Sequence, residues 1–144
     1  MEMSFLENRF TPAEAKYLNP LVLAFVGDAI YEVFVRAYLV DNYRDMHVHK
    51  LHKRAVEFVK AQAQSEFVKN IIDELTEEEL SIFKRGRNTK SATVPKNADV
   101  QDYRMATGFE SLIGYLYLTE QGDRLKYILN RVLDIYKQNN SQDR

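Results

Sequence analysis

Two carboxylates stand where the surrounding residues predict the buried face of a helix. Asp28 lies in the otherwise apolar run 24–30, and Glu110 lies in the run 108–118. Because an unpaired carboxylate that leaves water costs several kcal/mol, each of these side chains needs a cation, a hydrogen-bond donor or water nearby. A shared metal ion would meet both needs if the fold brings the two side chains together.

The atoms that these residues offer favour a hard ion. Carboxylate oxygens suit Mg²⁺ or Mn²⁺, and the chain has no cysteine to supply a thiolate. Mg²⁺ commonly binds one or two carboxylates together with water and substrate phosphates, so two carboxylates are sufficient for a site that acts on a phosphodiester. Three histidines lie within six residues of one another but lack the spacing of a zinc site, and they are interpreted as part of a solvated helix face: His47, His49 and His52.

Each carboxylate also has a purely structural interpretation. Asp28 follows Gly27 and could bond a neighbouring helix or cap a kink at that glycine. Glu110 has Ala106 and Gly114 four residues before and after it, and such small residues suit tight helix packing or a dimer seam as well as a hydrated ion. Taken singly, each segment favours the structural interpretation.

A basic segment follows an acidic one. Residues 73–79 hold five acids and no base, whereas residues 84–98 hold five bases and no acid. Cations next to a flexible backbone and short hydrogen-bond donors suit a phosphate clamp, and the alternative is a solvated loop that balances the acidic run. The candidate phosphate-binding residues are Lys84, Arg85, Arg87, Asn88, Lys90 and Lys96.

Helices are predicted almost throughout. Capping residues and apolar periodicity predict a first helix that begins at Thr11 and Pro12 and a last helix from Asp123 through Ile135. Between them, helices are predicted over residues 21–43, 46–72, 77–84 and 98–120. Asp45 is predicted to cap the second of these four, and Gly86 and Gly122 are predicted to end the third and the fourth. Residues 86–97 are predicted to form a loop, and the polar tail 138–144 is predicted to fray. No strand period or internal repeat is present, so the predicted fold class is all-α.

The whole chain is typical of one domain that acts away from membranes. Its 144 residues predict a single domain, and its net charge of −1 does not by itself indicate a polyanionic partner. The first residues do not form a secretion signal, and no apolar stretch approaches the roughly 20 residues that span a bilayer. The expected location is the cytoplasm.

The segments around both carboxylates resemble the ribonuclease III family. Residues 23–32, centred on a Gly-Asp pair, are similar to the signature helix of its catalytic domain, and residues 109–118 are similar to its second metal-binding helix. Residues 84–88 with 95–101 look like the Mini-III subgroup, bacterial enzymes without a separate double-stranded RNA-binding domain. The resemblance covers about residues 18–136. It implies the helical endonuclease-domain bundle of this family, built as an obligate homodimer.

The resemblance also implies an activity. It implies an endoribonuclease that uses Mg²⁺, with Mn²⁺ as a substitute, to hydrolyse double-stranded RNA into 5′-phosphate and 3′-hydroxyl ends. Asp28 and Glu110 are then the catalytic residues and metal ligands. The Mini-III resemblance further implies a role in maturing the precursor of large-subunit (23S) ribosomal RNA.

Departures from the larger family members reduce the expected acidic cluster. Those enzymes carry acids at the positions held here by Leu21, Ala24 and Thr107, so one ion per site is expected, with the Thr107 hydroxyl available to orient a metal-bound water. Glu32, one helical turn after the aspartate, is a lesser candidate. Two other functions stay open: a non-catalytic helical dimer that binds structured RNA, and a helical module whose basic loop docks an acidic protein.

Overall fold

Helices make up the regular structure of the chain. A computed structural model describes residues 5–7, 9–90, 94, 96 and 99–141, and these residues contain no strand, which confirms the predicted all-α class. The elements are α1 (Pro12–Tyr17), α2 (Pro20–Asn42), α3 (Val48–Val59), α4 (Ala61–Ile71), the short 3₁₀ helix η1 (Ile72–Glu74), α5 (Glu77–Asn88), α6 (Val100–Leu118) and α7 (Gly122–Ser141).

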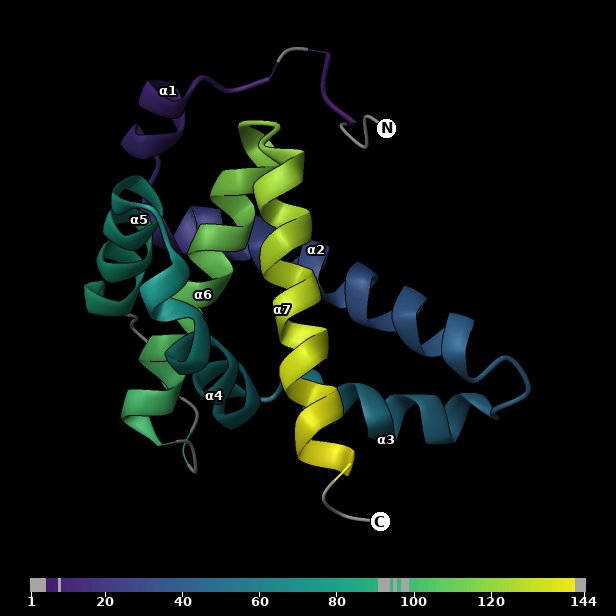
Figure 1. Cartoon of the computed structure of the whole chain (residues 1–144). Helices are drawn as coiled ribbons and strands as arrows, with labels where there is room; N and C mark the ends of the chain where they lie inside the picture. Colours follow the sequence, from purple (N-terminus) through teal and green to yellow (C-terminus); the bar gives the residue numbers. More distant parts are fainter. Residues whose placement is uncertain (1–4, 8, 91–93, 95, 97–98, 142–144) are drawn as a thin grey trace.

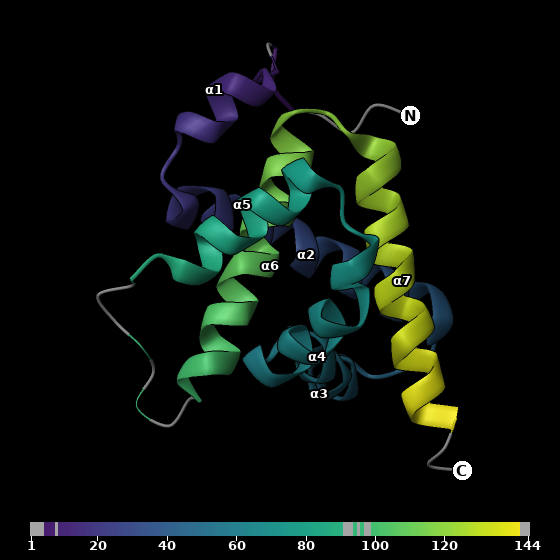
Figure 2. The ribbon, with the colours of Figure 1, turned by 60° about the vertical axis from the view of Figure 1, so that its left-hand side comes forward.

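Helix α6 is the centre of the fold. Figures 1 and 2 show α2, α4, α5 and α7 arranged around it, and α2, α4 and α5 share the most extensive contacts with it. Its side chains from residue 106 to 116 are buried with the sole exception, among these, of a half-buried Glu110. The Asp99 side chain accepts a hydrogen bond from the Asp102 backbone and caps the helix. Helix α6 therefore matches the helix predicted over residues 98–120, although Ala98 lies outside the described residues.

Two glycines allow α2 and α6 to touch backbone to backbone. A Cβ atom added at Gly27 would stand 1.7 Å from the carbonyl oxygen of Glu110, and one added at Gly114 would stand 2.0 Å from that of Leu23. No side chain fits at either position, so the two helices cross at the closest distance that their main chains permit.

A third close contact joins α5 to α6. A Cβ atom added at Gly86 would stand 2.4 Å from Ser111 Oγ, and one added at Gly108 would stand 2.7 Å from the carbonyl oxygen of Phe83. The prediction that Gly86 ends its helix is therefore wrong, because this glycine serves packing against α6 and the helix continues to Asn88. Residues 86–88, the first part of the predicted loop 86–97, consequently lie on this helix.

The single helix predicted over residues 46–72 is two helices. The chain leaves the helical conformation at Lys60, where φ is −63° and ψ is 149°. The Gln64 side chain donates to the carbonyl oxygen of Val59 at 2.9 Å and so supplies a partner to the end of α3. Asp45 does not cap this segment: the cap is His47, whose Nδ1 accepts from the His49 backbone at 3.3 Å.

The end of α6 also differs from the prediction. Glu120, not Gly122, takes the left-handed conformation after the helix, with a φ of 53°, and the Gln121 backbone donates back to the Leu116 carbonyl at 2.9 Å. Gly122 is instead the first residue of α7, which runs to Ser141. Residues 138–141 of the predicted frayed tail are thus helical, and residues 142–144 lie outside the described part.

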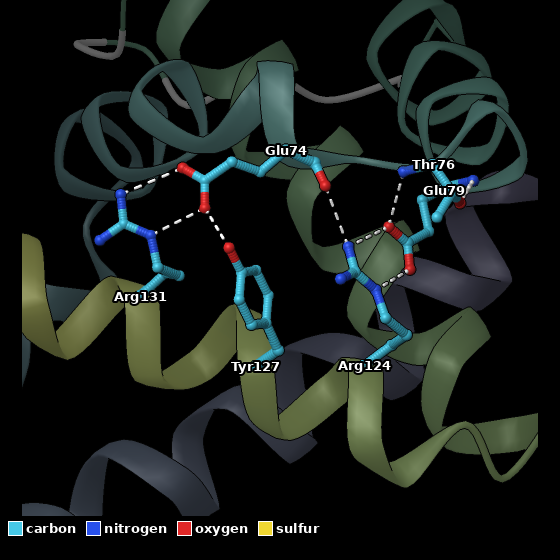
Figure 3. Close-up of polar contacts among 6 residues, drawn as sticks. All are labelled: Glu74, Thr76, Glu79, Arg124, Tyr127 and Arg131. Carbon is cyan, nitrogen blue, oxygen red and sulfur yellow. Dashed lines mark hydrogen bonds and ion pairs between the residues drawn. The ribbon is translucent and has the colours of Figure 1, made fainter.

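Helix α7 is joined to the start of α5 by a layer of arginine–carboxylate contacts (Figure 3). The guanidinium of Arg124 donates two hydrogen bonds, of 2.7 and 2.8 Å, to the buried Glu79 carboxylate. The guanidinium of Arg131 donates two, of 2.9 and 3.1 Å, to the Glu74 carboxylate. Glu79 also closes the predicted capping box with Thr76. The Tyr127 hydroxyl completes the layer by donating to Glu74. These contacts fix α7 along the side of the α4–α5 region.

The second half of α2 and the antiparallel α3 project together from the body of the fold (Figure 1). Large apolar side chains stay exposed along α2: Val22, Phe25, Val33 and Val40. A groove of about 190 Å³ lies between α2 and α3 and is lined by Arg36, Leu39, Val40, Val48, Leu51, His52 and Ala55. None of the described helices has the length and apolar character of a membrane span.

Candidate active site

The crossing of α2 and α6 brings the two predicted carboxylates into contact. Asp28 directly follows Gly27, and Glu110 is the residue whose carbonyl oxygen occupies the space beside that glycine. Asp28 is exposed and Glu110 is half-buried, so the pair opens to solvent on the Asp28 side. The prediction that both carboxylates are buried is therefore wrong for Asp28 and holds in part for Glu110.

The two carboxylates repel each other when both are ionised. Burial is the largest cause that raises the pKa of Glu110; with the negative charge of Asp28 and a hydrogen bond between Asp28 and the protonated form, the pKa reaches about 8. A site in which one acid is driven to take up a proton lacks positive charge. A divalent cation between the carboxylates would supply that charge and replace the proton.

The donor set fits Mg²⁺ or Mn²⁺. It consists of carboxylate oxygens, which hard divalent cations prefer. Within the described part of the chain, no group of three or more histidine, aspartate or glutamate side chains converges on one point. The remaining ligands of an ion held here are therefore water or substrate oxygens, as expected for a site completed by phosphate.

A buried glutamine that the sequence did not reveal lies next to the pair. Gln64, on α4, is only 2% exposed, and its Nε2 donates to Glu110 Oε2 at 3.2 Å. This hydrogen bond lowers the pKa of Glu110 and so opposes the effects of burial and of Asp28. No pattern pointed to this residue, because its position depends on the unpredicted helix break at Lys60.

The lesser candidates are engaged elsewhere. Glu32 forms an ion pair with Arg36 at 3.1 Å, and its charge adds a smaller contribution to the raised pKa of Glu110. The buried Thr107 hydroxyl donates to the Tyr103 carbonyl at 3.0 Å. Because the Thr107 hydroxyl proton is used in this hydrogen bond, the hydroxyl oxygen could only accept a hydrogen bond from a metal-bound water.

The predicted phosphate-binding residues extend from the last turns of α5. Lys84, Arg85 and Asn88 are exposed, and Arg87 is half-buried, with its guanidinium 5.8 Å from the ring centroid of Phe83. Lys90 and Lys96 are exposed beyond the helix, and residues 91–93, 95 and 97 of the predicted loop lie outside the described residues. Among residues that the structure describes, none of the five cations forms an ion pair, so their charge is available to an anion: Lys84, Arg85, Arg87, Lys90 and Lys96.

The basic end of α5 packs against the helix that carries Glu110. Gly86 lies between Arg85 and Arg87 and packs on Ser111, the residue that follows Glu110. The Ser111 hydroxyl is itself within hydrogen-bond distance of the Pro20 carbonyl at 2.9 Å, at the start of α2. The basic helix, the metal-binding candidates and the glycine crossing are thus parts of one packed unit.

Comparison with known proteins identifies the family of the chain. The model of the Ribonuclease III domain matches residues 21–121, a range that contains both carboxylates and the basic end of α5. A protein of Fusobacterium nucleatum with a crystal structure superposes with a TM-score of 0.75 at 36% identity, over 83% of this chain and 94% of that one.

Curated relatives match over nearly their full length. The Mini-ribonuclease 3 of Clostridium tetani is 51% identical over 143 residues, which cover 99% of this chain and 95% of the relative. The Mini-ribonuclease 3 of a Thermoanaerobacter species is 49% identical over 138 residues, which cover 94% and 96%. The chain therefore belongs to the ribonuclease III family, in its Mini-ribonuclease 3 group.

Proposed function

We propose that this double-strand-specific endoribonuclease holds one Mg²⁺, or Mn²⁺ in its place, between Asp28 and Glu110. The observation that carries the proposal is the interaction of these carboxylates at the α2–α6 crossing, where the charge of Asp28 raises the pKa of Glu110. Two acids packed this closely lower the stability of the metal-free fold, and binding of a cation offsets that cost.

The chain's own residues divide the work between binding and orientation. The chemistry that a bound Mg²⁺ would supply is polarisation of a phosphoryl oxygen and a lower pKa of a coordinated water. Hydrolysis that breaks the bond between phosphorus and the 3′ oxygen leaves 5′-phosphate and 3′-hydroxyl ends. Asp28 and Glu110 bind the ion in their ionised forms. The amide of Gln64 donates to Glu110 and favours its ionised form.

The basic end of α5 is proposed to bind the RNA backbone. A-form RNA is recognised mainly by its shape, phosphates and 2′-hydroxyls, which suits exposed cations better than base-reading side chains. The proposed contacts are Lys84, Arg85, Arg87, Asn88, Lys90 and Lys96. We further propose that the substrate is the precursor of 23S ribosomal RNA and that the enzyme acts in the cytoplasm.

The exposed apolar face of α2 is proposed to form a homodimer. Val22, Val33 and Val40 follow a helical spacing that aligns them along one side of α2, and Phe25 lies beside that line with 79% of its surface exposed. An apolar surface of this extent indicates a protein partner. A second copy of the chain is the proposed partner, because a largely apolar groove between α2 and α3 borders the same face and could take a side chain of that copy.

A cleavage assay on a long RNA duplex tests the enzyme proposal. We expect cutting with Mg²⁺, none with EDTA, and none from Asp28→Asn or Glu110→Gln, while both variants still fold and bind RNA. Parent-like cleavage by either variant would remove that residue from the site. Duplex that is bound but stays intact under every condition would instead favour the non-catalytic RNA-binding dimer.

A further inference from the structure

Gln64 connects the carboxylate pair to the break between α3 and α4. Its Nε2 donates to Glu110 Oε2 at 3.2 Å and to the Val59 carbonyl at 2.9 Å. Val59 is the last residue of α3, so no later turn of that helix reaches its carbonyl. Both donor positions of one amide group are therefore occupied by acceptors from different helices.

These two acceptors determine the orientation of the amide. Reversing it would turn Oε1 toward a carbonyl and a carboxylate, where no hydrogen bond can form. In the observed orientation Oε1 has no hydrogen-bond partner in the described part of the chain, although it is buried. A buried acceptor without a partner costs free energy. The orientation that lets the Gln64 amide donate to Val59 and Glu110 therefore leaves its own oxygen without a partner among the described residues.

We infer that Gln64 is a positioning residue that holds the Glu110 carboxylate toward Asp28, where the two would bind the metal ion. This inference rests on the proposed function of the carboxylate pair. The geometry supports it, because a hydrogen bond to one carboxylate oxygen fixes the side chain and leaves the other oxygen for an ion. Hydrogen bonds behind metal-binding carboxylates commonly increase metal affinity in this way.

A purely structural role for Gln64 makes a different prediction. If the residue served only to cap α3, its replacement would lower stability and leave metal affinity unchanged in the folded protein. If it positions Glu110, its replacement weakens metal binding in a protein that still folds. Removal of the amide also removes the unpartnered Oε1, which offsets the loss of the Val59 contact.

Gln64→Met and Gln64→Asn test the inference. Methionine has a similar length but no donor, whereas asparagine keeps the amide on a side chain too short to reach both acceptors. Gln62→Met is the matched control, since Gln62 is exposed on the same helix. Three measurements are made: the Tm in EDTA, the Mn²⁺ concentration that raises the Tm in the absence of RNA, and the Mg²⁺ concentration for half-maximal cleavage.

We expect both Gln64 variants to need about tenfold more Mn²⁺ and Mg²⁺ than the parent, with excess Mg²⁺ restoring most of the cleavage. The Gln64→Met variant should keep the parent's Tm in EDTA, and Gln62→Met should match the parent in all three measurements. A folded Gln64 variant with the parent's metal midpoints would overturn the inference; if the methionine variant does not fold, the asparagine variant decides. A parent protein without metal-induced stabilisation or cleavage would instead refute the proposed function.

Discussion

Gly27 and Gly114 face each other where α2 crosses α6, and a Cβ atom added at Gly27 would stand 2.8 Å from the Gly114 backbone nitrogen. The absence of two side chains therefore sets the separation of the helices. Because Asp28 and Glu110 lie beside this contact, the same absence sets the distance between their carboxylates.

Alanine at either glycine should lower both stability and activity. The added methyl group meets backbone atoms that cannot move aside, so we expect Gly27→Ala and Gly114→Ala each to cost about 2 kcal/mol or more in urea denaturation. Gly122→Ala is the control, because a Cβ atom there meets nothing within 4 Å, and it should be neutral or slightly stabilising. Equal stability of all three variants would refute the role of the crossing.

Stability without metal should decrease as pH rises. The pKa of Glu110 is raised from 4.5 to about 8, so between these values the folded state keeps a proton that the unfolded chain releases. The free energy of unfolding in EDTA should therefore fall between about pH 5 and pH 8, and Glu110→Gln should flatten this dependence and stabilise the protein at pH 8. Added Mg²⁺ should restore the parent at pH 8, and an unchanged pH slope in the variant would contradict the assignment.

Loss of the Arg124 contact should loosen α7. Arg124→Met leaves the buried Glu79 carboxylate with the hydrogen bond that it accepts from the Thr76 backbone, at a cost of about 2 kcal/mol because the guanidinium itself is partly exposed. The exposed pair of Arg44 with Asp41 gives the control, and Arg44→Met should change stability by less than about 0.5 kcal/mol. Chemical denaturation of both variants measures the difference, and equal effects would exclude a special role for the buried pair.

Removal of the α5 cations should weaken RNA binding in a salt-dependent manner. Lys84, Arg85 and Arg87 replaced together by alanine should reduce duplex affinity at least about tenfold and lower the slope of log K against log salt by about two. A triple alanine variant at exposed lysines with the same change in net charge is the control: Lys69, Lys126 and Lys137. Equal losses in both triple variants would mean that net charge, not this surface, binds the RNA.

A charge on the apolar face of α2 should separate the subunits. Phe25→Glu is expected to convert a dimer to a monomer in light scattering coupled to size exclusion, because a carboxylate cannot be buried unpaired at an apolar contact. Tyr17→Glu is the control, since Tyr17 is even more exposed than Phe25 but lies on α1. A monomeric parent, or a Phe25→Glu variant that stays dimeric, would refute the proposed interface.

Local signals predicted the elements well where the residues that decide them are neighbours in sequence. The capping boxes opened by Thr11 and Thr76 lie where they were expected, because each is completed within four residues. Gly86 was misinterpreted as a helix end, since the residue that explains it, Ser111, is distant in the chain.

The candidate site was predictable to the same degree. The two acids and the basic segment are recognisable as unusual residues in their own segments. Gln64 was not, because nothing in its neighbours indicates that α3 stops at Val59 or that Glu110 lies opposite. A contact between three helices is a property of the tertiary structure alone.

The contact of Gly86 with Ser111 has a consequence for where RNA is cut. This contact fixes the basic residues of α5 relative to the helix that carries Glu110. In the proposed function, the separation between a phosphate bound at Arg85 and the phosphate hydrolysed at Glu110 is then fixed by the protein backbone. Replacement of Lys90 or Lys96 would change the affinity for a duplex but not this separation.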